Sequence, residues 1–244
     1  MRPLWKLTAT EVKLFLREPA AVFFTFAFPL LLLWLNGGDR NRPTAELGGL
    51  GLIDVLVPGY VALILAEAGL TSLPGLLAGY RERGILRRLA VTPVSPARLL
   101  IGQFLAHLAV ATVGAALVVG AGALLFDLNP PRAPAGLLAA YLLGAGALFA
   151  IGFVVAALVP TPRTAEAVGL VLFFPMIFLS GAVVPREALS DGMRRLGEVL
   201  PLTPVVGSLR AAWTGGGPGL LTLGVLAAII VVATAVAART FRWE

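Results

Sequence analysis

Residues 55–79, VLVPGYVALILAEAGLTSLPGLLAG, form a long apolar segment in which Glu67 is the single charged residue. The hydrocarbon core of a bilayer is about 30 Å thick, and a helix needs roughly 20 apolar residues to cross it. This segment is long enough to do so. We therefore predict that it is a membrane-spanning helix, and that its carboxylate faces protein or a watery cavity rather than lipid.

The whole chain shares this apolar character. Of its 244 residues, 58% are hydrophobic and only 13% are charged, and the mean hydropathy is +0.92. Soluble globular chains average roughly 45–50% apolar and about 25% charged residues. So few charges could not cover the surface of a soluble domain, and the chain is far too apolar for intrinsic disorder. The composition predicts an integral membrane protein.

Five further apolar stretches are long enough, or nearly so, to span the bilayer. We therefore predict an all-α fold, with a single transmembrane domain over residues 1–244. The six expected spans are 20–35, 55–79, 99–126, 135–159, 164–184 and 219–238.

The distribution of basic residues predicts the orientation of the chain. An even number of spans puts both termini on one side, and Lys and Arg concentrate on the cytoplasmic side of membrane proteins. With cytoplasmic termini, the inside segments hold Arg2, Lys6, Lys13, Arg17, Arg81, Arg83, Arg87, Arg88, Arg98, Arg163, Arg239 and Arg242. The outside segments would hold fewer: Arg40, Arg42, Arg132, Arg186, Arg194, Arg195 and Arg210. Both termini are therefore expected in the cytoplasm.

Two regions predict short helices outside the spans. In residues 3–18, Lys6, Lys13 and Arg17 form a basic stripe opposite an apolar face, which is typical of a helix lying on the cytoplasmic leaflet. A plain lead-in to the first span is the alternative. Residues 185–213 hold two helical patterns that are too short to cross a bilayer, and we expect them at, or dipping into, the outer surface.

Two carboxylates lie within expected spans. Glu67 could bind a cationic or polar group of a substrate or relay protons, or it could be structural, hydrogen-bonded to Thr71 one turn on or to a polar residue of a neighbouring helix. Glu166 lies near the start of the fifth span, where a carboxylate favours the helix dipole.

Several kinds of chemistry have no support in the sequence. It contains no cysteine, no G-x-x-x-x-G-K-[ST] phosphate-binding loop and no H-E-x-x-H motif. The lone histidine, His107, has no second ligand at a suitable spacing, so we expect it to be packed rather than metal-bound. We predict no catalytic residues, no metal site, no cofactor bound by this chain and no nucleic-acid partner.

The loop between spans two and three, residues 80–98, is basic and amphipathic. Arg83 and Arg87 are four residues apart, beside a small apolar face. Such a segment suits docking onto a partner protein. Contact with anionic lipid at the cytoplasmic surface is the alternative.

Two motifs are informative when taken together. The first runs from Glu82-Arg-Gly-Ile-Leu86 through Leu89 to Thr92-Pro93. The second is Phe174-Pro-Met-Ile-Phe-Leu-Ser-Gly-Ala-Val-Val-Pro185, followed by Leu200-Pro-Leu-Thr-Pro204 and Ser208-Leu-Arg210. They resemble motifs of type-2 ABC exporter permeases, especially the drug-exporter-like branch. With the six-span layout, the resemblance covers essentially the whole chain.

The resemblance implies a transmembrane subunit that pairs with a second copy or a close paralogue and with two separately encoded ATPase subunits, which would bind ATP and Mg²⁺. It implies a multi-pass protein of a bacterial inner (plasma) membrane that exports amphiphilic drugs or lipids. Residues 3–18 would be the connecting helix, and 81–90 the coupling helix. Its ATPase-coupling residues would be Arg81, Glu82, Arg83, Gly84, Ile85, Leu86, Arg87, Arg88 and Leu89. The substrate-pathway candidates are Glu67, Thr71, Pro175, Ser180 and Gly181.

Two other functions are compatible with parts of the sequence. One is a proton-coupled secondary transporter that uses Glu67, although no internal repeat supports it. The other is a scaffold without transport activity, which would need neither kinked helices nor an intramembrane carboxylate.

Overall fold

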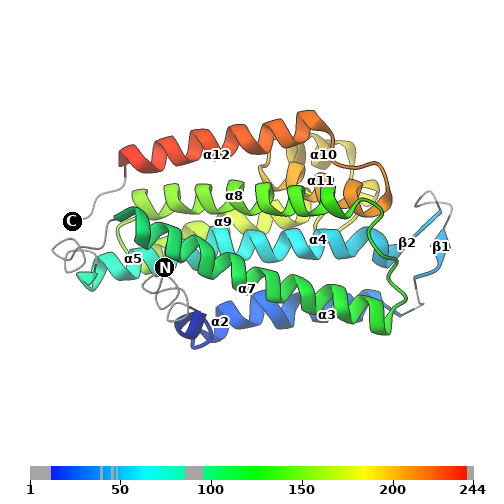
Figure 1. Ribbon diagram of the computed structural model, residues 1–244, viewed down its shortest axis with the longest axis horizontal. Coiled ribbons are helices and arrows are strands. Elements are labelled where there is room, and N and C mark those ends of the chain that lie inside the picture. Colours follow the sequence, from blue (N-terminus) through cyan, green and yellow to red (C-terminus); the bar gives the residue numbers. More distant parts are fainter. Residues whose placement is uncertain (1–11, 39–40, 45–46, 48, 86–95, 241–244) are drawn as a thin grey trace.

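The computed structural model is a bundle of long, roughly parallel and antiparallel helices with a small two-stranded sheet at one end (Figure 1). It describes residues 12–38, 41–44, 47, 49–85 and 96–240. Six helical stretches are long and apolar enough to cross a membrane, as predicted. They are Pro19–Asn36, Leu52–Glu82, Arg98–Leu125, Pro134–Leu158, Pro162–Leu179 and Leu220–Thr240.

These stretches are built from ten helical elements, two of them short π-helices. The first stretch comprises α2 (Pro19–Val22), η1 (Phe23–Ala27) and α3 (Phe28–Asn36), and the second comprises α4 (Leu52–Glu67), η3 (Ala68–Ser72) and α5 (Leu73–Glu82). The remaining four are α7 (Pro96–Leu125), α8 (Pro134–Leu158), α9 (Pro162–Leu179) and α12 (Leu220–Thr240). Strands β1 (Pro43–Thr44) and β2 (Leu50–Gly51) pair antiparallel before α4.

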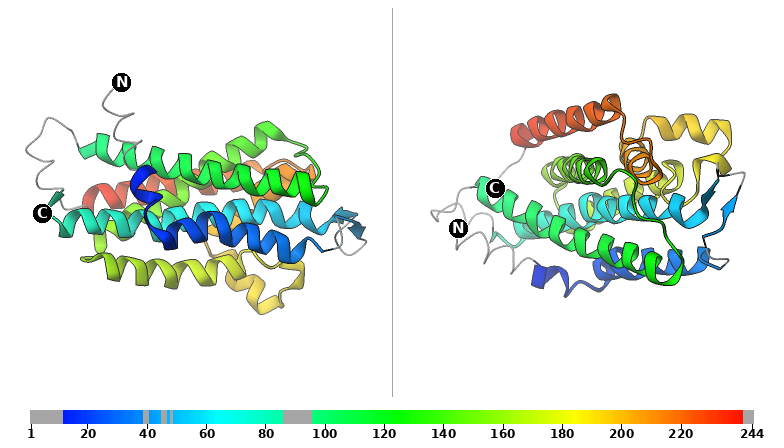
Figure 2. Two further views of the ribbon diagram at one scale, coloured as in Figure 1. Left: turned by 90° about the horizontal axis from the view of Figure 1, so that it is seen from below. Right: turned by 45° about the vertical axis from the view of Figure 1, so that its right-hand side comes forward.

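The second stretch, α4–η3–α5, is the centre of the bundle. Ninety-four per cent of its most apolar window is buried, against 50% or less in the other five. It packs against α3, α7, α8 and α9, which surround it (Figure 2). Its one intramembrane carboxylate therefore faces protein, as predicted.

Both π-helices precede a proline. The backbone N–H of Phe28 bonds to the carbonyl of Phe23, and that of Leu73 bonds to the carbonyl of Ala68, each five residues back. Proline has no N–H and crowds the carbonyl four residues before it, and a π-turn is one way for a helix to accommodate this. Pro29 and Pro74 therefore account for the two irregular turns.

Glycines bring two neighbouring helices close to the backbone of η3. A Cβ at Gly152 of α8 would collide with the carbonyl oxygen of Gly69, and one at Gly169 of α9 would lie 3.1 Å from the Cα of Thr71. A side chain at either position would push the helices apart. Within the described residues, these glycines serve packing inside the chain.

The fifth span and the segment after it differ from the prediction. Helix α9 ends at Leu179 rather than at residue 184, because Gly181 turns the chain with φ +91°. A 3₁₀ turn, η4 (Arg186–Ala188), and helix α10 (Asp191–Glu198) follow. They stand where the first of the two short helices in residues 185–213 was expected. The chain begins a new helix here because Ser190 accepts a hydrogen bond from the Met193 N–H (3.5 Å).

Helix α11 (Leu202–Thr214) is one of the two short helices expected at, or dipping into, the outer surface, and it enters the bundle. It packs against α4 and α8, and most of its residues are buried. Trp213 Nε1 donates to the carbonyl of Asn129 (2.9 Å). The helix contains a single charged residue, Arg210, so its other faces can enter the core.

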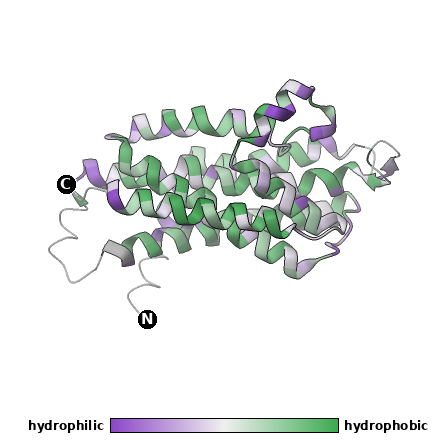
Figure 3. Ribbon diagram, turned by 90° about the horizontal axis from the view of Figure 1, so that it is seen from above, coloured by the Kyte–Doolittle hydropathy of each residue, from purple (hydrophilic) through white to green (hydrophobic). Residues whose placement is uncertain are grey.

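The most hydrophilic residues lie mainly toward the two ends of the bundle, and hydrophobic residues predominate along the length of the helices (Figure 3). The ends of α5 and α12 and the start of α2 lie toward the same end of the bundle, away from the β1–β2 hairpin (Figure 1). The prediction places this end in the cytoplasm.

Candidate functional site

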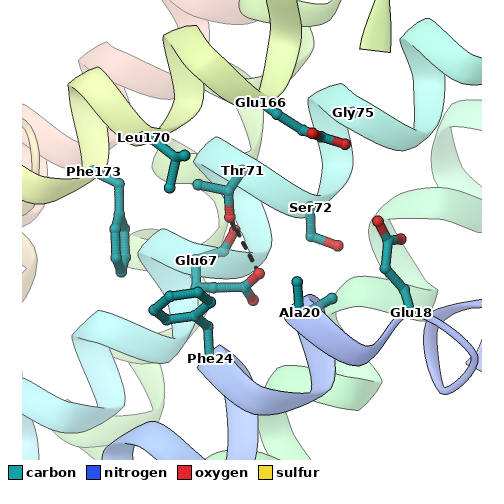
Figure 4. A pocket seen from close by; sticks show the side chains of 11 residues that line it. Glu18, Ala20, Phe24, Glu67, Thr71, Ser72, Gly75, Glu166, Leu170 and Phe173 are labelled. Carbon is teal, nitrogen blue, oxygen red and sulfur yellow. Dashed lines mark hydrogen bonds between the residues drawn. The ribbon is translucent and has the colours of Figure 1, made fainter. Parts of the chain in front are cut away.

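A cavity of about 190 Å³ lies between the first, second and fifth membrane stretches. Residues Glu18, Ala20 and Glu166 are exposed and form its mouth, whereas Glu67 is buried at its closed end. Figure 4 shows the side chains that line it. They are Glu18, Ala20, Ala21, Phe24, Glu67, Thr71, Ser72, Gly75, Glu166, Leu170 and Phe173.

Glu67 is held by hydroxyl groups from two helices. Thr25 Oγ1, in η1, donates to Glu67 Oε2 at 2.6 Å. Thr71 Oγ1, one turn along the same helix, lies 3.1 Å from Glu67 Oε1. Only 3% of the Glu67 surface is exposed. These are the two kinds of structural partner that the sequence suggested.

The hydroxyl groups cannot saturate the carboxylate. Thr71 Oγ1 also lies 2.6 Å from the backbone carbonyl of Glu67, and its single proton can be donated fully to only one acceptor. An ionised carboxylate has about four acceptor positions. Glu67 therefore retains hydrogen-bonding capacity on its cavity side, so the structural role leaves room for a ligand.

The charge and shape of the cavity favour a positively charged amphiphile. Three carboxylates, Glu18, Glu67 and Glu166, are among the lining residues, and none of the described lining residues is basic. Phe24 and Phe173 supply aromatic walls. Aromatic faces and carboxylates both attract cations, the carboxylates most strongly where water is excluded.

The structure brings together two of the five substrate-pathway candidates. Glu67 and Thr71 line the cavity, but Pro175 is exposed on α9. Ser180 and Gly181 are buried just after α9, where a Cβ on Gly181 would lie 2.7 Å from Arg186 Cγ.

Other residues of this cavity were not predicted from the sequence. Thr25, Phe24 and Phe173 lie on different helices from Glu67, so no local pattern connects them with it. A signal was available only at Thr25, a buried hydroxyl in an otherwise apolar span.

His107 is packed, as expected. Its Nδ1 lies 2.9 Å from the carbonyl of Gln103, and its Nε2 lies 3.4 Å from Ser72 Oγ. The rings of Phe15 and Phe149 approach it edge-on. No group of potential ligands that could hold a metal occurs among the described residues.

The proposed coupling segment is only partly described. Arg81 and Glu82 form the last turn of α5, and the chain turns at Gly84 with φ +65°. The turn at Gly84 separates Arg81 and Glu82, at the end of α5, from Ile85, so the described part of the segment 81–90 is not one uninterrupted helix. The coupling role of this segment stays a prediction. Leu86, Arg87, Arg88 and Leu89 lie outside the described residues.

The N-terminal segment is also only partly described. Residues 12–15 are helical, and Phe15 is buried while Lys13 and Arg17 are exposed. Phe15 packs with Ala21 and Val110. The rest of the predicted interfacial helix, including Lys6, lies outside the described residues.

Comparison with known proteins agrees with the resemblance carried by the two motifs. No curated protein matches the chain. The family model described as ABC-2 type transporter matches residues 2–213, which include the first five membrane stretches and the cavity between them. The chain therefore belongs to the ABC-2 type transporter family of membrane subunits.

Proposed function

We propose that this chain is the permease subunit of an ATP-driven exporter in the inner membrane of a bacterium. A dimer with a second copy or a close paralogue forms the substrate pathway, and separately encoded ATPase subunits bind ATP and Mg²⁺. Family membership supports the permease role. The absence of a phosphate-binding loop from the sequence is in keeping with hydrolysis in a partner chain.

One observation carries the proposal: the long helical stretch that lines the cavity also leads into the loop that would contact the ATPase. Glu67 closes α4, and the helix continues through η3 and α5 to Glu82, next to the loop that would contact the ATPase. A push on that loop would act along α5 and η3, which line the cavity through Thr71, Ser72 and Gly75. The π-turn of η3 therefore lies at the cavity itself, and π-turns often mark functional positions.

The mechanism follows from this continuity. ATP-driven closure of the ATPases would shift the loop and α5, and thereby move η3 relative to α9 and η1. Such a shift changes transport only if substrate binds the two arrangements with different affinity. The hydrogen bond between Thr25 and Glu67 crosses the moving boundary, so its geometry would differ between the two arrangements.

We propose that the substrate is an amphiphile with a positive or hydrogen-bond-donating head group. The head would reach Glu67, and the apolar body would contact Phe24, Leu170 and Phe173. The cavity of about 190 Å³ would take the head and part of the body. The second copy would enclose the remainder.

Affinity purification of the tagged chain in mild detergent tests the proposal. We expect an ATPase with a phosphate-binding loop to co-elute in stoichiometric amount. Arg83→Glu combined with Arg87→Glu should abolish that association while the chain remains in the membrane. Arg42→Glu, on an exposed residue of the opposite loop, is the matched control and should retain it.

Two results would contradict this function. Unchanged co-purification of the double variant would remove the docking role of the loop. No ATPase, together with transport by the chain alone driven by a proton gradient, would establish the secondary transporter instead.

A further inference from the structure

A second cavity lies on the opposite side of the second stretch from the candidate site, between α7, α8 and α12. Its volume is about 540 Å³. It is lined by Leu100, Ile101, Phe104, Leu142, Gly146, Ala150, Phe153, Ile230, Thr234, Ala237 and Ala238. Ile101, Leu142 and Thr234 are exposed, so the cavity is a groove that opens to the surroundings of the bundle. Its lining is apolar except for Thr234, as the hydrocarbon of a bilayer requires.

A polar cavity of about 520 Å³ continues the groove toward the predicted cytoplasmic end. It is lined by Arg81, Ala157, Leu158, Val159, Pro160, Arg239 and Thr240. Phe153 of the groove and Ala157 of the polar cavity are one turn apart on α8, on the same face of the helix. On α12, Ala238 of the groove is followed directly by Arg239. The two cavities therefore follow one another along the seam where α12 packs on α8.

The charge of the polar cavity is positive. Arg81 and Arg239 line it, and none of its described lining residues is acidic. Helices α8 and α12 both end here, and each helix C-terminus carries about half a negative charge. Two full positive charges outweigh these half charges. Arg81 Nη1 also donates to the carbonyl of Val159 (2.9 Å), which satisfies one of the terminal acceptors of α8 and fixes the guanidinium beside the cavity.

We propose that this seam binds one anionic phospholipid of the cytoplasmic leaflet. Its phosphate lies beside the exposed guanidinium of Arg239, with Arg81 lining the same cavity, and one acyl chain fills the groove between α7, α8 and α12. An apolar groove beside a basic site at membrane-surface depth matches the two parts of such a lipid. The cytoplasmic leaflet is the one whose anionic lipids attract basic residues.

The selectivity of the site comes from the head group. An acyl chain leaves one apolar environment for another when it enters the groove, so little hydrophobic free energy is gained. A basic residue near the surface contributes about 1 kcal/mol toward an anionic lipid, which is about five-fold in affinity. The protein should therefore prefer an anionic lipid to a zwitterionic one with the same acyl chains.

Native mass spectrometry of the full chain, released from detergent with added lipid, measures this preference. Phosphatidylglycerol and phosphatidylcholine with identical acyl chains are the probes. We expect phosphatidylglycerol to bind at least five-fold more tightly, and Arg239→Gln to reduce its affinity about five-fold. Thr234→Trp, which fills the groove, should reduce binding of both lipids, whereas Val231→Trp, on an exposed residue of α12 outside the groove, should not.

Three outcomes would overturn the proposal. They are equal affinity for the two lipids, an unchanged preference in Arg239→Gln, or the same loss with Val231→Trp as with Thr234→Trp. Glycerol phosphate, which has the head group without acyl chains, separates a lipid site from a site for free phosphate. If it competes as well as the whole lipid does, the groove has no role and the proposal is wrong.

Discussion

Replacing Glu67 by glutamine would remove the charge at the closed end of the cavity and keep the size of the side chain. The amide oxygen can still accept the hydrogen bond that Thr25 Oγ1 donates to Glu67 Oε2 in the parent protein (2.6 Å). The amide nitrogen can donate to Thr71 Oγ1, which would then donate to the backbone carbonyl of residue 67 at 2.6 Å. Because both partners stay satisfied, we expect the variant to fold and insert like the parent protein.

The loss should appear in the binding of a cation. Hydrogen bonds to charged groups contribute about 1.5–3 kcal/mol, and those between neutral groups about 0.5–1.5 kcal/mol. The difference of roughly 1–1.5 kcal/mol corresponds to about a five- to thirteen-fold loss of affinity. Two unit charges 4 Å apart interact by about 4 kcal/mol at an effective dielectric constant of 20, which sets the upper limit for a cation without donors.

Tetraphenylphosphonium, a permanently charged amphiphile, is a suitable probe. Its binding to the protein in lipid nanodiscs can be measured with a tetraphenylphosphonium-selective electrode. Tetraphenylphosphonium has no hydrogen-bond donor, so the loss in Glu67→Gln is coulombic. With the phenyl rings holding the charges roughly 8 Å apart, an effective dielectric constant of 20 gives about 2 kcal/mol, or about a thirty-fold weaker binding. Glu166→Gln, at the exposed mouth, should weaken it less than five-fold, because exposed charges contribute only about 0–1 kcal/mol.

Unchanged binding in Glu67→Gln would refute the role of this carboxylate in the site. An equal loss in both variants would point to a general surface potential rather than to a site at Glu67. If Glu67→Gln fails to accumulate in the membrane, the hydrogen bonds of the carboxylate, rather than the weaker ones of an amide, are needed for folding. Thr25→Val should then fail in the same way, and the structural role would be the correct one.

Three further predictions concern packing and the outer surface. Gly152→Ala should lower the free energy of unfolding of the solubilised protein, measured by thermal denaturation, by about 1–3 kcal/mol, because its Cβ would collide with a carbonyl of η3. Gly120→Ala is the control and should leave it unchanged, because nothing lies within 4 Å of the added Cβ. Asp54→Ala, measured in the same way, should cost about 1.5–3 kcal/mol, because Asp54 accepts two hydrogen bonds from the loop between α7 and α8 (3.0 and 2.8 Å). Partial burial raises the pKa of Glu187, but the hydrogen bonds from Arg210 outweigh it and hold that pKa below its usual range. The ion pair between Arg210 and Glu187 (2.8 Å) should therefore stabilise the protein at a pH above the ordinary carboxyl pKa, and this stabilisation should be lost as the pH falls through the lowered pKa. A double-mutant cycle should give a coupling free energy under about 1 kcal/mol at neutral pH and none in strong acid.

The six spans could be predicted from the sequence because membrane helices depend on length and apolar composition, which are local properties. Their ends could be predicted less well. Helix α9 stops at Leu179 because Gly181 takes a left-handed conformation, and the apolar residues that follow give no sign of this. Helix α11 was expected at, or dipping into, the outer surface because it is too short to span. The sequence does not tell how deep it lies, and in the structure it packs against α4 and α8.

The candidate site could be predicted only around its central residue. Glu67 is conspicuous as a carboxylate in an apolar segment, and Thr71 is one helical turn away from it. Thr25, Phe24 and Phe173 belong to other helices, and which of their faces meet Glu67 depends on two π-turns and on the close approach at Gly169. The rotation of each helix about its own axis, which decides the face that meets Glu67, arises from tertiary packing. It leaves no periodic pattern in a single sequence.

The most direct test of the exporter function is ATP-driven transport by the chain together with its ATPase in inside-out proteoliposomes. We predict that tetraphenylphosphonium accumulates only when ATP and Mg²⁺ are present, and that Glu67→Gln reduces the accumulation while ATP hydrolysis continues. Accumulation driven by a proton gradient without the ATPase would contradict the exporter function and would identify a secondary transporter.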